Sequence, residues 1–154
     1  MPQTLEEFHA KIEHMMAEGD AWLIARGAAS DDLVKRRIAD SVLVLASYQL
    51  FVHREVFAPM LEHADARTRA RVTELKVECI ALTEDLRFNV RELMARADDA
   101  PLDWDMIASG VGWFNRRVRA HIAQVRQMMA PELSDADHAR LRAHRNDLVG
   151  AQAA

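Results

Sequence analysis

The sequence predicts an all-α protein, folded as an up-and-down four-helix bundle with a short fifth C-terminal helix. Half of its 154 residues are hydrophobic and 29% are charged, which is the composition of a globular domain. Only 5 Gly and 4 Pro are present, too few for the many turns of an all-β protein. Apolar residues instead recur at steps of three and four, the spacing of one helix face. Because the length fits one domain, we expect residues 1–154 to form a single bundle.

Capping and stop signals divide the chain into five helical segments. Thr4 and Glu7 form a capping box, and Gly27 is a natural C-terminal stop. Pro59 is expected to bend or end the last turns of the second helix, and Pro131 to close the fourth. Short connections make sequential helices antiparallel neighbours. The predicted helices span about residues 4–27, 30–63, 66–97, 103–130 and 134–149.

Five residues on the apolar stripes are not ordinary core residues. They are His9, Gln49, His53, Cys79 and His121. With a rise of about 1.5 Å per residue, their distances from the helix ends place all five within about two turns of one another. Imidazole, amide and thiol groups from four helices would then share one layer of the core, which is where helical bundles build metal sites.

The second and fourth helices also end on related motifs. The second ends FAPML at 57–61, and the fourth ends MAPEL at 129–133, an offset of 72 residues. The same offset pairs Gln49 with His121, and His53 follows Gln49 by four residues. Both helices therefore carry an inward pair of positions ahead of the same closing motif.

These segments resemble the hemerythrin-like, or HHE cation-binding, family over roughly residues 4–133. In that family the second and fourth helices each carry a histidine, then a carboxylate four or five residues later, and the bundle holds two iron ions. The first and third helices contribute further histidines. The segments that carry the resemblance are EEFHAKIEHMM, HREVFAPML, ELKVECIALTEDL and HIAQVRQMMAPEL. The resemblance implies a metal-binding four-helix bundle.

Carried over residue by residue, the family pattern is incomplete. His9 and His121 stand at histidine positions of the family. Gln49 stands where the second helix would have its histidine, and His53 stands where its bridging carboxylate would be. Cys79 replaces a histidine of the third helix.

The carboxylate of the fourth helix is missing as well, since Val125, or Arg126 one residue further on, takes its place. Two cations held close together need anionic bridging oxygens, so a di-iron centre is not expected. Three imidazoles and a thiolate can still form a tetrahedral site for one zinc or ferrous ion. The candidate ligands are His9, His53, Cys79 and His121.

Each candidate also has an ordinary structural interpretation. A buried histidine can be satisfied by a neighbouring group or by water, and Cys79 can serve as a small buried hydrophobe. Gln49 can hydrogen-bond a ligand histidine and orient it, or have no role.

The function favoured by these residues is sensing of a metal or a small ligand, with at most one iron or zinc ion bound. The alternative is a metal-free regulatory module that binds another protein through the same bundle. An enzyme that handles oxygen, nitric oxide or peroxide at a single iron is a third and less favoured function. The sequence has no phosphate-binding glycine loop, no nucleophile elbow and no paired acidic motif, which favours a protein that is not an enzyme.

Composition and the N-terminus indicate the compartment and the partners. The net charge of −4 gives no sign of nucleic-acid binding. No apolar run approaches about 20 residues, and the N-terminus lacks the pattern of a signal peptide. A single cysteine fits a reducing compartment. We therefore expect a cytoplasmic protein with neither nucleic acid nor membrane as a partner.

If metal binds, we expect at most one ion per chain, because no carboxylate remains on the apolar stripes to hold a second cation. Elemental analysis of protein purified without a histidine tag measures this ratio. Two irons per chain, together with the absorption band of an oxo bridge, would contradict the prediction.

Overall fold

The computed structural model describes the backbone of residues 3–152 and the side chains of residues 3–130. The chain divides into two compact units, residues 1–121 and 122–154, and each is described by itself. The boundary falls within a helix and not at a linker. The single domain expected over residues 1–154 stays a prediction. All candidate site residues lie in the first unit.

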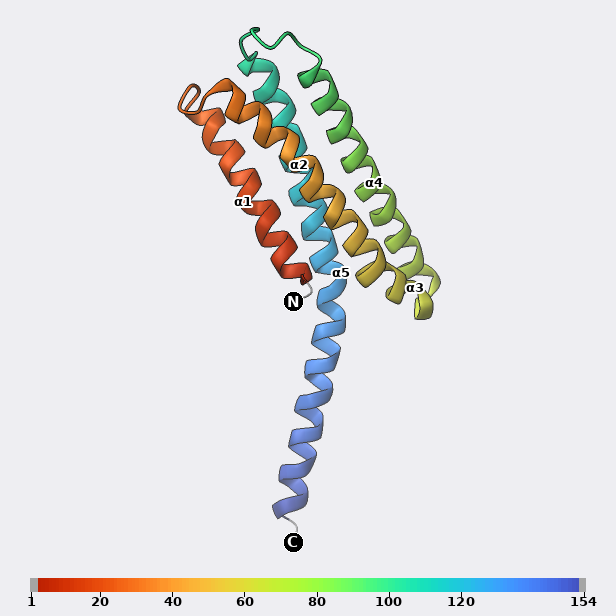
Figure 1. Cartoon of the computed structure of the whole chain (residues 1–154). Coiled ribbons are helices and arrows are strands. Elements are labelled where there is room, and N and C mark those ends of the chain that lie inside the picture. Colours follow the sequence, from red (N-terminus) through yellow and green to blue (C-terminus); the bar gives the residue numbers. More distant parts are fainter. Residues whose placement is uncertain (1–2, 153–154) are drawn as a thin grey trace. The chain divides into compact units, whose positions relative to one another are not determined.

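The regular structure of the described residues is entirely helical, which confirms the all-α prediction. Among these residues, no helix is both long enough and apolar enough to cross a membrane. The elements are α1 (Leu5–Ile24), α2 (Asp31–Phe51), the π-helix η1 (Val52–Phe57), α3 (Ala58–His63), α4 (Ala66–Met94) and α5 (Trp104–Gln152) (Figure 1).

Side-chain caps fix where the helices begin. Thr4 accepts a hydrogen bond from the backbone N–H of Glu7, whose carboxylate accepts one from the N–H of Thr4, so the capping box is confirmed. Ser30 caps α2 and Asp65 caps α4 in the same way. Asp103 accepts a hydrogen bond from the first turn of α5. Each cap satisfies a donor that the helix itself cannot pair.

The helix predicted over residues 30–63 is helical throughout but contains one widened turn, η1. The backbone N–H of Ala58 donates to the carbonyl of His53, five residues back. Pro59 is the second residue of α3, which begins at Ala58. A proline has no N–H to donate, and its ring crowds the carbonyl four residues earlier, so a π turn relieves the clash. The irregularity expected at Pro59 therefore falls on η1, which ends two residues before the proline.

Pro131 does not end the fourth helix, which corrects the predicted stop at residue 130. α5 runs without a break from Trp104 to Gln152, so the separate helix predicted at about 134–149 is its distal part. An internal proline costs about 3 kcal/mol through a lost hydrogen bond and a ring clash. The flanking Met, Ala, Glu and Leu residues are strong helix formers, and the helix continues.

Within the first unit, α2 packs against both α1 and α4. Arg117 and Arg119 of α5 are separated by one residue and form ion pairs with different helices. Arg117 pairs with Asp85 of α4 at 2.7 Å. Arg119 pairs with Asp20 at 2.8 Å and Glu13 at 3.1 Å, both on α1. These pairs hold the first part of α5 against α1 and α4.

The buried stripe of α2 differs from the predicted one. The predicted stripe runs through Leu45, Gln49 and His53. In the structure Leu45 is buried as expected, but Tyr48 and Val52 are buried in place of Gln49 and His53. Gln49 and His53 are half-buried at the edge of the stripe. A phenol ring gains more from burial than a primary amide, whose donors and acceptor would need partners inside the core. This preference sets the rotation of α2.

Two glycines should respond to alanine substitution in opposite ways. Gly27 has a φ of 85° in the loop after α1, so Gly27→Ala should lower the free energy of unfolding by about 1 kcal/mol. Gly110 lies inside α5, and an added Cβ would meet nothing within 4 Å. Gly110→Ala should therefore raise that free energy by about 0.5–1 kcal/mol. Urea unfolding of both variants measures the changes, and a shared sign would contradict the account.

Candidate functional site

His9, Tyr48 and His121 form a buried polar cluster contributed by α1, α2 and α5. Their exposed fractions are 1%, 1% and 2%. The Nε2 atom of His9 lies 3.4 Å from the Tyr48 hydroxyl oxygen, a weak hydrogen bond. The Tyr48 ring meets His121 edge-on, with ring centroids 6.0 Å apart and an interplanar angle of 86°. One phenol thus contacts both imidazoles.

Helix periodicity explains why these imidazoles are inside. His9 lies three residues before Ile12, and His121 three residues after Val118. Both apolar partners are fully buried, so residues on the same helix face are buried with them. The predicted burial of His9 and His121 is confirmed.

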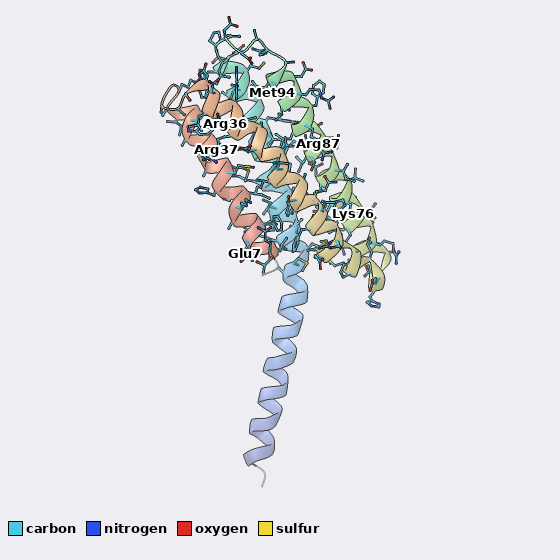
Figure 2. The ribbon with its side chains drawn as sticks, in the orientation of Figure 1. Glu7, Arg36, Arg37, Lys76, Arg87 and Met94 are labelled. Carbon is cyan, nitrogen blue, oxygen red and sulfur yellow. The ribbon has the colours of Figure 1, made fainter. Side chains whose placement is uncertain are left out.

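His53 approaches the cluster from η1. Its ring centroid lies 5.5 Å from that of Phe57, and the side chain is half-buried. Burial lowers the pKa of His53, and the positive charge of Lys76, labelled on α4 in Figure 2, lowers it further. The Nε2 atom is buried and has no hydrogen-bond partner among the described residues.

His121 is the least satisfied side chain of the cluster. Neither ring nitrogen has a hydrogen-bond partner within residues 3–130, although the side chain is 2% exposed. A neutral imidazole carries one donor and one acceptor, and each buried group left without a partner costs about 1–3 kcal/mol. A native helix bundle keeps such a residue only where something compensates for that cost.

The surroundings of His121 also fix its charge. Burial, followed by the charges of His9 and His53, lowers the pKa of His121 to about 4. The ring is therefore neutral at physiological pH. One of its nitrogens presents a lone pair, as a metal ligand or a hydrogen-bond acceptor must. The influence of His9 and His53 also indicates that the three imidazoles, from α1, η1 and α5, lie near one another.

The structure does not join Cys79 to these histidines. Cys79 is 1% exposed in α4, and burial, with a contribution from the charge of Glu78, raises the pKa of its thiol to about 12. Within residues 3–130, no three His, Cys, Asp or Glu side chains lie close enough together to hold a metal ion. The Gln49 amide makes no hydrogen bond to a histidine in the same part of the chain. The roles expected for Cys79 and Gln49 stay predictions.

Tyr48 was missed by the sequence analysis. It lies three residues after Leu45 and four before Val52, which is the spacing of a core stripe. Gln49 and His53 also lie at helical spacing from Leu45. The predicted stripe followed these two polar side chains and therefore placed the wrong face of α2 in the core.

No protein-family model, curated protein or solved structure matches this chain. The resemblance to hemerythrin-like proteins therefore rests on the four sequence segments and stays a prediction.

The low pKa of His121 predicts that acid destabilises the fold. The folded pKa is about 4 and the unfolded value 6.5, so between these values the unfolded chain binds more protons. Stability should be complete above about pH 6.5 and fall as pH drops toward 4, by up to about 3 kcal/mol. His121→Leu should remove this component. Urea unfolding of parent and variant between about pH 7 and pH 4 measures it, and parallel curves would refute the assignment.

Proposed function

We propose that this protein binds one transition-metal ion, iron or zinc, at His9, His53 and His121, named here the histidine cluster, and acts as a sensor of that metal or of a small ligand bound to it. The observation that carries the proposal is the state of His121, which is neutral, buried and without a hydrogen-bond partner at either ring nitrogen. An incoming ion would accept the lone pair of this ring and offset the cost of its burial.

The donor chemistry of the cluster fits a borderline metal. Neutral imidazole is the commonest protein ligand of zinc and iron, and zinc accepts three nitrogens and one sulfur in a tetrahedron. Cys79 would supply the sulfur after losing its proton, so binding through the thiolate would release a proton. Because the side chains do not converge in this conformation, binding also requires rotation of at least one ring. His53 is half-buried, so its rotation disrupts the least packing.

The proposal includes descent from a hemerythrin-like bundle, with α1, the α2–α3 segment, α4 and the first part of α5 in up-and-down order. The packing of α2 on α1 and α4 supports this order. The ion pairs of α5 with α1 and α4 support it too, because they close the ring of four helices.

A metal-free interaction module remains the second candidate, and one observation favours it. Leu43 and Leu50 lie seven residues apart on α2, on the side away from its core stripe, and are 70% and 74% exposed. Val77 and Phe88 on α4 are 62% and 60% exposed. Large apolar side chains on the outer face of a bundle are typical of a surface that contacts another protein.

Thermal unfolding with and without metal tests the proposal. Zinc or ferrous iron at a hundredfold excess over its Kd should stabilise the parent by about 2.7 kcal/mol, which raises Tm by about 5–10 °C. A chelator should reverse the shift. His121→Leu should melt at the same temperature under all conditions, because the ligand is gone.

His63→Ala is the matched control, since His63 is an exposed histidine at the end of α3. This variant should keep the full metal-dependent shift. A parent whose Tm does not respond to either metal would remove the metal hypothesis and leave the interaction module. A shift lost equally in both variants would show surface binding instead.

A further inference from the structure

The bundle is hollow at the end where α4 finishes and α5 begins, away from the histidine cluster. A cavity of about 360 Å³ lies between α2, α4 and α5. A second cavity of about 280 Å³ lies between α1, α2 and α5 and shares part of its wall. The shared wall consists of Ile38, Leu86, Ile107, Val111 and Phe114. The larger cavity is an apolar space apart from Asn89, Glu92 and Arg96 on its lining.

Glycine residues in the helices keep these two cavities open. Gly110 lines the larger cavity, and a Cβ added there would meet nothing within 4 Å. Gly19 of α1 lies opposite Val111, at 3.7 Å from its added Cβ to the valine methyl. Glycine in a helix interior is less stable than alanine. At both positions a larger side chain would also occupy part of a cavity. Ile38 and Val111, which line both cavities, are only half-buried.

One cation lies at the mouth of the larger cavity. Arg96 follows α4, just beyond Met94, which is labelled in Figure 2. Its Nη2 atom lies 3.1 Å from the sulfur of Met106 on α5. Among the described residues, no carboxylate forms an ion pair with Arg96, and Glu92, one turn earlier on the same wall, stays apart from it. A guanidinium in contact only with a thioether retains its capacity for bidentate binding of a carboxylate.

We propose that this cavity binds a medium-chain fatty acid, with the alkyl chain in the apolar space and the carboxylate on Arg96. The volume falls within the range of small-molecule pockets, which are mostly apolar with a few polar groups that fix orientation. A medium-length alkyl chain is flexible enough to follow the apolar side chains that α2, α4 and α5 contribute to this cavity. Among the described residues that line this larger cavity, Arg96 is the one cation, and it selects an anionic head group. This site is separate from the histidine cluster and independent of any metal there.

Calorimetric titration tests the proposal, with decanoate below its critical micelle concentration and decanol below its solubility limit. Decanoate should bind saturably, one molecule per chain, and more tightly than decanol. Arg96→Gln should weaken decanoate binding about tenfold, to the level of decanol, because a charge-assisted hydrogen bond is lost. Glu92→Gln should tighten decanoate binding and leave decanol unchanged, because a nearby like charge is removed.

Two further variants decide where the ligand lies. Arg91→Gln removes an exposed arginine of α4 that does not line the cavity, so decanoate binding should not change. Gly110→Phe should fill the cavity and abolish binding of both probes, with helicity checked by circular dichroism. Absent saturable binding, equal affinity for the two probes, or equal losses in Arg91→Gln and Arg96→Gln would overturn the proposal.

Discussion

Burial of one apolar stripe on each helix is the constraint on which the rest of this structure depends. A helix turns 100° per residue, so residues three or four positions apart lie near the same face, and the packing of that face decides which of them are buried. His9 and His121 enter the core in this way, between Phe, Ile and Val neighbours. The carbon atoms of an imidazole pack well against such neighbours, whereas its nitrogens need partners, and burial keeps His121 neutral. Packing thus sets both the position of the imidazoles and the protonation state on which their chemistry depends.

The π turn of η1 adds the second determinant of the site. Each residue of a π turn advances by a smaller angle than in an α-helix, so the face presented after the turn is rotated relative to the face before it. Tyr48 belongs to the regular stripe of α2, whereas His53 lies at the start of the widened turn and meets Phe57 within it. Pro59 makes the wide turn favourable and thereby controls His53 from six residues away.

Much of the first unit follows from local sequence rules. The caps at Thr4, Ser30 and Asp103, the helix content and the burial of His9, Cys79 and His121 could be predicted because each depends on spacing within one helix. The choice between Tyr48 and Gln49 could not, because two stripes pass through Leu45 and only the neighbouring helices select one. The helix was also expected to end at Pro131. That expectation considered the proline alone and not the high helix propensity of its neighbours. Whether the candidate ligands converge depends on several helices at once, and spacing along one helix cannot predict it.

The two arginines of α5 have a mechanical consequence. Arg117 and Arg119 project about 200° apart around the helix axis, since each residue adds 100°. One engages carboxylates of α4 and the other those of α1. A rotation of α5 about its own axis in either direction would carry both side chains away from their partners together. These paired contacts therefore fix the rotational setting of the first part of α5 relative to α1 and α4.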